Sequence, residues 1–305
     1  MNDVAELPKP GWQAELDLRI GVRPQFGDGV SRLVARRHRG PLVIQRPFYP
    51  EGDPCHLYVV HPPGGVVGGD ELRIRVEVER GAHAVITTPA ATKFYRCDGR
   101  TSSQTQELSA AGATLEWLPQ ESIFYRGAET RTATRVHLDA ESRFIGWEIA
   151  CLGLPARGER FDVGALKLDL EVWRDTGTGT DFAKPKSEPV PATSAPELGT
   201  SAPLFIDRLR LTGSSPARGA RWGLAGQDAV GTLLATPTSR GHLEEVRELV
   251  ADLPLAAVSL VDGILVLRAL APQAEALRNL FVEAWKRLRP GVIGRVAVPP
   301  RIWST

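Results

Sequence analysis

Cysteine is scarce in this sequence: its 305 residues include only Cys55, Cys97 and Cys151. An odd number at wide spacing argues against a disulfide framework and fits a protein of the reducing cytosol. No stretch approaches the roughly 18 consecutive apolar residues of a transmembrane helix. The first residues, MNDVAELPKPGW, carry acids where a signal peptide has a basic start and an apolar run. We therefore expect a cytoplasmic protein.

The net charge is also close to zero, because 37 Lys and Arg residues are balanced by 36 Asp and Glu residues, which gives +1. No global field would then attract nucleic acid or an anionic membrane. The stretch 32–39, RLVARRHR, is a local basic excess that we interpret as a solvated strand or loop face. The length allows one large core or two modest ones.

Strict alternation of apolar and polar residues predicts β-strands over much of the first two thirds. In LRIRVEVERG, Leu72, Ile74, Val76 and Val78 alternate with charged residues, and LKLDLEVW from Leu166 repeats the pattern. Turn signals between such runs favour a sandwich, a barrel or stacked sheets. We find no internal repeat of fixed period.

Helical periodicity is confined to the C-terminal third. Apolar residues recur at three and four positions in 242–254 and in 273–289, which predicts two helices. Between them, AAVSLVDGILVLRA predicts a hairpin that turns at Asp262-Gly263. Segment 176–203 is rich in Gly, Pro, Ser and Thr, and we expect a mobile surface loop. The predicted fold is mainly β, with stacked β-sheets in one large domain spanning 1–305 and two helices in the C-terminal third.

The glycine-rich segment 61–70, HPPGGVVGGD, is the first place to look for a nucleotide site. Gly64 and Gly69 have the spacing of a phosphate-binding loop, but Asp70 stands where its lysine belongs and would repel phosphate. Val66 occupies the second glycine position of the dinucleotide pattern, which also fails. We interpret the segment as a rigid turn in which Asp70 caps the backbone, with a functional contact left open.

Metal and hydrolytic chemistry have weaker signals. His61 and Asp70 are suitable metal ligands in type, but no CxxC or HExxH spacing occurs. Glu116, Glu121 and Glu148 could supply a carboxylate pair for a hydrolase. Apolar and small residues surround Glu148 in GWEIACLGLP, so an inward-facing carboxylate there needs a partner, a water or a metal.

Five segments taken together resemble the urease accessory protein family UreD, called UreH in some organisms. They are HPPGGVVGGDEL from residue 61, TTPAATKFYR from 87, LEWLPQESIFYRGA from 115, GWEIACLGLPARGERF from 146, and the terminal LRPGVIGRVAVPPRIWST. Their order and spacing match the family, from about residue 14 to the C-terminus with the exception of 176–203.

The resemblance implies a non-enzymatic scaffold for nickel delivery. Family members bind UreF, which recruits the GTPase UreG, and the assembly docks on apo-urease so that nickel can bridge a carbamylated lysine. The missing phosphate-binding loop agrees with this role, since GTP chemistry belongs to UreG. The resemblance implies no tightly bound cofactor, only nickel in transit.

The resemblance also implies two groups of site residues. Positions matching a proposed nickel channel are Asp70, Glu148, His61 and Glu116, whose scattered ligands would let the ion leave. Partner contacts carried over from the family fall on Phe281, Trp285, Arg301 and Trp303, although Trp303 could instead plug the core. A β-rich hydrolase and a metalloenzyme with a retained metal remain alternatives.

Overall fold

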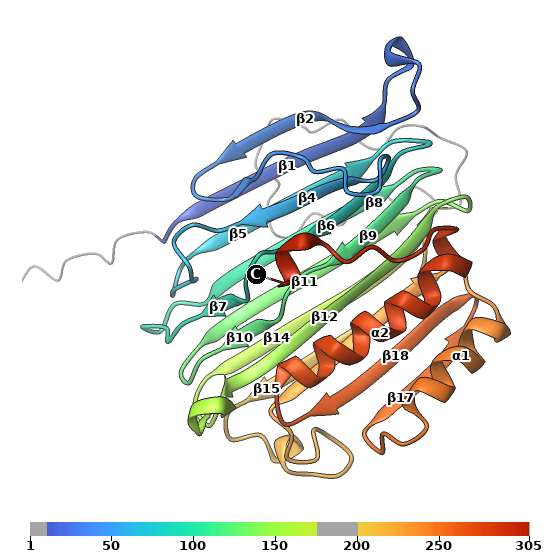
Figure 1. The fold of residues 1–305 in the computed structure, drawn as a ribbon. Helices are drawn as coiled ribbons and strands as arrows, with labels where there is room; N and C mark the ends of the chain where they lie inside the picture. The colour runs from blue at the N-terminus through green and yellow to red at the C-terminus, as the bar shows by residue number, and fades with distance from the viewer. Residues whose placement is uncertain (1–10, 176–200, 305) are drawn as a thin grey trace, which may run out of the picture.

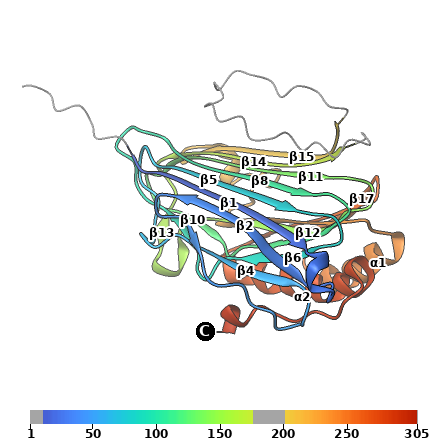
Figure 2. The same cartoon turned by 90° about the horizontal axis from the view of Figure 1, so that it is seen from above.

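The computed structural model describes residues 11–175 and 201–304. Two large β-sheets stack on one another, and both helices cover the outer face of the second sheet (Figures 1 and 2). This architecture confirms the predicted fold class of stacked β-sheets with two helices in the C-terminal third.

Among the described residues, the first sheet has seven strands in the order β15-β14-β11-β8-β5-β1-β2. Its five central strands run parallel, and the edge strands β2 and β15 are antiparallel to their neighbours. The strands are β1 (Gln13–Val22), β2 (Ser31–Arg39), β5 (Glu71–Val78), β8 (Ser102–Ala110), β11 (Glu129–Leu138), β14 (Ala165–Asp175) and β15 (Ser201–Thr212).

In the same part of the chain, which excludes 1–10 and 176–200, the second sheet has eleven strands, with the main order β17-β18-β16-β12-β9-β6-β4-β3. These strands are β3 (Val43–Ile44), β4 (Cys55–Val60), β6 (His83–Thr87), β9 (Thr114–Leu118), β12 (Arg143–Leu154), β16 (Ala229–Thr236), β17 (Ala256–Val261) and β18 (Ile264–Ala271). Three short strands branch from it, namely β7 (Thr92–Phe94), β10 (Ser122–Phe124) and β13 (Glu159–Arg160).

The chain crosses repeatedly from one sheet to the other. Strands β5, β8 and β11 of the first sheet are followed at short turns by β6, β9 and β12 of the second. Register pairs Glu71 with Ser103, Ser103 with Arg131, and Arg131 with Lys167. The numbers of residues between these paired positions differ from one strand to the next. This difference explains why the repeated crossing between the sheets leaves no fixed repeat in the sequence.

The predicted alternation accounts for the core between the sheets. Leu72, Ile74, Val76 and Val78 of β5 are all at most 4% exposed, whereas Arg73 and Arg75 face solvent. Each such apolar side chain contributes roughly 1.5–3 kcal/mol by leaving water. A second core forms where α2 packs on the outer face of the second sheet. The molecule therefore has two buried layers, one between the sheets and one between the second sheet and α2.

Both predicted helices are confirmed, as α1 (Arg240–Val250) and α2 (Ala274–Ile293). Helix α2 continues past the predicted end at residue 289. Pro290 lies in the last turn, where its missing N–H removes only one intrahelical bond, so the helix does not end there. The hairpin is confirmed, with φ of 48° at Asp262 and 78° at Gly263. Neither described helix is both long and apolar enough to cross a membrane.

The predicted loop 176–203 lies mostly outside the described residues. Its last three residues belong to β15, which begins at Ser201 and pairs with β14. The sequence placed this boundary too late because Ser, Ala and Pro at 201–203 carry no strand signal of their own.

Candidate functional site

A cavity of about 300 Å³ lies between the two sheets. Its walls come from β5, β8, β11, β14 and β15 of the first sheet and from β4, β9, β12 and β16 of the second. Most of the lining is apolar, but a band of polar side chains crosses it: Gln104, Gln106, Thr132, Glu148, Asp207 and Thr232. A largely apolar cavity with a few convergent polar groups is the usual form of a binding site.

Glu148 is the central polar residue of this cavity. It lies on the inner face of β12, and its carboxylate bonds to the hydroxyl of Thr134 on β11, across the space between the sheets. Burial raises the pKa of Glu148 to about 7, and the carboxylates of Asp207 and Asp169 add to the rise. Among residues 11–175 and 201–304 no cation pairs with it. In this part of the structure the Glu148 carboxyl group therefore lacks a charged partner.

Asp207 completes the polar band at the edge strand β15. Its carboxylate lies 3.5 Å from the hydroxyl of Thr232 on β16 and 2.9 Å from the guanidinium of Arg268 on β18. Register places Glu148, Thr232 and Arg268 side by side on one face of the second sheet. The polar band therefore runs from the middle of the cavity to its lateral edge.

His61 lines the same cavity from the loop that follows β4. Burial lowers its pKa, against an opposing effect of the Asp70 charge, so the imidazole is neutral near pH 7. A neutral imidazole and scattered oxygen donors are ligands that a borderline divalent cation accepts. Of the four predicted nickel-path residues, the structure brings His61 and Glu148 into one cavity, whereas Asp70 and Glu116 do not line it.

Asp70 instead holds the glycine-rich turn together. Its two carboxylate oxygens accept N–H bonds from Trp12, at 2.8 Å, and from Val67, at 3.0 Å. Gly69 adopts a φ of +88°, and a Cβ on Gly11 would lie 2.1 Å from the Gly69 carbonyl carbon. The interpretation of 61–70 as a capped turn is confirmed, and its glycines serve positive φ and close backbone approach.

Glu116 lies on the other face of the second sheet, in a buried network with α2. Its carboxylate accepts bonds from Arg289 at 3.0 Å, from the Trp285 indole at 2.6 Å and from His83 at 2.7 Å. Burial acts to raise the pKa of Glu116, but His83 and Arg289 outweigh it and the pKa is lowered. This carboxylate is fixed by its partners and is not free to carry an ion.

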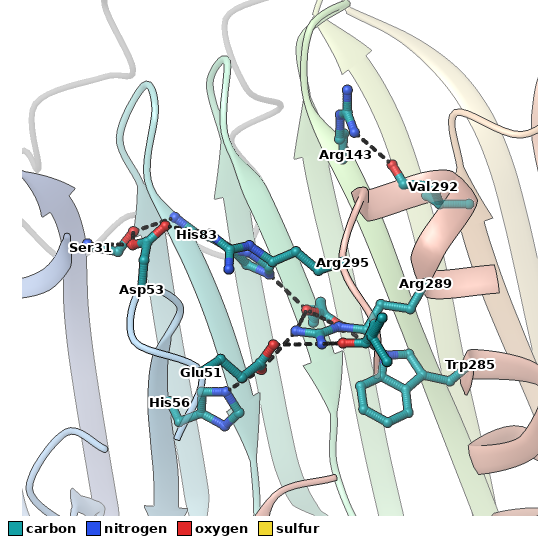
Figure 3. Close-up of polar contacts among 12 residues, drawn as sticks. Ser31, Glu51, Asp53, His56, His83, Arg143, Trp285, Arg289, Val292 and Arg295 are labelled. Atoms are coloured by element: carbon teal, nitrogen blue, oxygen red, sulfur yellow. Dashed lines mark hydrogen bonds and ion pairs between the residues drawn. The ribbon is translucent and has the colours of Figure 1, made fainter. Parts of the chain in front are cut away.

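Arg289 extends the network to the loop before β4. Its guanidinium bonds to Glu51 at 2.7 and 2.8 Å, and Glu51 also contacts His56 at 2.8 Å (Figure 3). Burial opposes ionisation of Glu51, yet His56 and Arg289 lower its pKa to about 2. Arg289 itself is fully buried. The network therefore anchors α2 to the sheet.

Two of the three carboxylates considered for hydrolysis, Glu116 and Glu148, are separated by the fold. Glu116 faces α2 and Glu148 faces the cavity, from adjacent strands of one sheet. A catalytic pair has to flank one substrate bond, which these two cannot do. Across the described part of the chain, no group of three or more His, Cys, Asp or Glu is placed to hold a metal.

The predicted partner residues are mostly interior. Phe281 and Trp285 are fully buried on the inner side of α2. Trp303 packs 5.8 Å from the Trp147 ring and 5.7 Å from that of Trp285, and its indole donates to Thr87 at 3.0 Å. The structure therefore favours the alternative in which Trp303 closes the core. Arg301 is exposed and remains accessible to a partner.

Several residues of the polar band were not predicted from the sequence. Gln106 and Thr132 lie in SSQTQELSA and ETRTATRVHL, strands in which polar residues occur at both the odd and the even positions. The sequence of such a strand does not indicate which set of alternate residues faces inward. Polar residues at both sets of alternate positions were themselves a signal of buried polar side chains. In a strand of a stacked sheet, one of the two sets must face the interior.

The fold and this site define a class of protein: a scaffold of two stacked β-sheets with a largely apolar cavity between them that a band of polar side chains crosses. The model of the UreD urease accessory protein family matches residues 13–304, and the chain belongs to that family.

Curated relatives align with this chain over almost their whole length. The chain is 42% identical to the urease accessory protein UreD of Pseudomonas putida strain W619, over 97% of this chain and 95% of the relative. It is 42% identical to that of Klebsiella aerogenes, over 97% and 98%. It is 41% identical to that of Alkalilimnicola ehrlichii, over 97% and 92%. A role in urease maturation follows from membership of this family.

Proposed function

We propose that this chain is a non-catalytic scaffold that passes nickel through the cavity between its sheets to apo-urease. In this proposal it works in the cytoplasm with UreF and, through UreF, the GTPase UreG. Family membership supports the assignment to urease maturation. The free thiols of Cys55, Cys97 and Cys151 are consistent with a reducing compartment.

The observation that carries the nickel proposal is the cavity that contains both Glu148 and His61. An ion in transit needs ligands that bind weakly and in succession, because a closed cage would retain it. The cavity offers a carboxyl group, a neutral imidazole and amide and hydroxyl oxygens along one band. Their spread over several strands suits passage better than storage.

The accessible part of the C-terminal region supports the proposed contact with UreF. Arg301 is exposed beside Trp303, and both lie in a short 3-10 helix, Arg301–Ser304, on the outer face of the second sheet (Figure 1). An arginine next to a partly buried tryptophan is a frequent anchor of protein interfaces. Phe281 and Trp285 would then support this surface from beneath.

Complementation tests the proposal. A urease operon lacking its UreD gene is expressed with and without this chain, and urease activity and nickel per urease are measured. Restoration of both in proportion is the expected result. Soluble chain that binds UreF yet restores neither would refute the maturation role.

A further inference from the structure

The lateral edge of the sandwich is open where the cavity reaches β15. The inward-facing residues Phe205, Asp207 and Leu209 of this strand are only half buried, whereas Leu170 and Val172 on neighbouring β14 are buried. Asp207 lines the cavity, and 33% of its side chain is exposed. The cavity therefore approaches solvent beside this carboxylate.

Arg268 occupies the outer side of that carboxylate. Its guanidinium lies 2.9 Å from Asp207 and 5.5 Å from the Phe205 ring, so it spans from β18 of the second sheet to β15 of the first. Since 52% of the Arg268 side chain is exposed, the ion pair is a solvated one. Such pairs are worth about 1 kcal/mol or less and break readily.

A divalent cation in the cavity and the guanidinium of Arg268 compete for one carboxylate. When Arg268 holds Asp207, Glu148 is the one carboxyl group among the described lining residues that has no charged partner. When Arg268 moves away, two carboxyl groups face the cavity, and together they would hold a divalent ion more tightly. The state of the ion pair thus sets how strongly a cation is retained.

We propose that Arg268 is a built-in competitor for Asp207 that prevents nickel from being retained and favours its release at the edge between β15 and β18. This inference rests on the proposed nickel path. It adds a residue that controls release and a position for one opening.

The test is a double-mutant cycle on the full chain in complex with UreF. Nickel sulfate is added, and bound nickel per chain is measured by equilibrium dialysis for wild type, Arg268→Gln, Asp207→Asn and the double variant. Arg268→Gln should bind nickel roughly tenfold more tightly, since it frees a charged ligand, and should transfer less nickel to apo-urease. The same substitution made with Asp207→Asn should have no such effect.

Arg210→Gln is the matched control, because Arg210 lies on β15, the strand of Asp207, but pairs with Asp169 on the outer face of the first sheet. Arg268→Lys keeps the ion pair and should resemble wild type. Equal nickel binding by Arg268→Gln and Arg210→Gln would overturn the inference, as would an Arg268→Gln effect that persists with Asp207→Asn. Failure of the wild-type chain to raise urease nickel would instead refute the proposed function itself.

Discussion

Glu116 and Glu148 lie on adjacent strands of one sheet and face opposite layers of the molecule. Glu116 is fully buried and bonded to Arg289, Trp285 and His83 beneath α2. Glu148 faces the cavity between the sheets, where its carboxylate accepts a hydrogen bond from the hydroxyl of Thr134. One carboxylate serves architecture, and the other faces the cavity through which we propose that nickel passes.

The anchoring role of Arg289 predicts a large loss of stability on its removal. Arg289→Met leaves Glu51 and Glu116 buried without their cation, which should lower the free energy of unfolding by about 3–5 kcal/mol. Urea unfolding of the full chain measures this. Lys286→Met on the same helix removes only an exposed pair with Glu283 and should cost about 1 kcal/mol or less. Equal losses in the two variants would contradict the anchoring role.

The pKa of Glu148 predicts a pH-dependent difference between wild type and Glu148→Gln. Because burial raises the pKa from 4.5 to about 7, the folded chain binds this proton more tightly than the unfolded chain does. Wild-type stability should therefore fall as pH rises from about 4.5 to 7, and Glu148→Gln should lack this component.

Urea unfolding at pH 5 and pH 8, with a chelator present, measures this difference. At pH 8 Glu148→Gln should be more stable than wild type by on the order of 3 kcal/mol, and at pH 5 the two should be similar. Glu159→Gln, at an exposed position, is the control. A constant offset between Glu148→Gln and wild type at both pH values would show that Glu148 is ionised in the cavity.

The turn at 61–70 predicts that Asp70 matters for folding. Asp70→Ala leaves the amides of Trp12 and Val67 without an acceptor and should destabilise the chain by about 2 kcal/mol. Asp162→Ala, which removes an exposed ion pair with Arg126, should be nearly neutral. Thermal denaturation compares the two. Unchanged urease nickel at matched amounts of folded Asp70→Ala chain would exclude Asp70 from the nickel path.

The contacts of the C-terminal tail predict that Trp303 contributes to the stability of the fold and Arg301 to partner binding. Trp303→Ala removes packing on Trp147 and Trp285 and should cost roughly 3 kcal/mol. Arg301→Ala should change stability by less than about 0.5 kcal/mol while weakening UreF binding. Calorimetry of unfolding and of UreF binding tests both. Full UreF affinity in Arg301→Ala would place the interface elsewhere.

The sequence predicted the elements whose periodicity is strong. Alternation in β5 and β14, helical spacing in α1 and α2, and the Asp262-Gly263 turn all follow from local patterns that the structure confirms. These patterns are set by which side chains must leave water, so one chain suffices to detect them.

The candidate site was only partly predictable. Glu148 stood out because apolar neighbours surround it, but nothing local could pair it with Thr134 or Asp207, which come from distant strands. Asp70 and Glu116 had the right chemistry and the wrong surroundings, a backbone turn and a buried ion network. Facing direction and long-range register decide such assignments, and both arise only when the sheets stack.

The most direct test of the nickel path is to fill the cavity. Thr132→Phe places a bulky side chain into it from β11, whereas Arg131→Phe on the same strand points outward and is the matched control. Nickel per urease active site is measured after activation by chain–UreF–UreG complexes of equal concentration. The account predicts that Thr132→Phe delivers much less nickel than wild type and that Arg131→Phe delivers the same. Full delivery by a folded Thr132→Phe complex would show that nickel does not pass between the sheets.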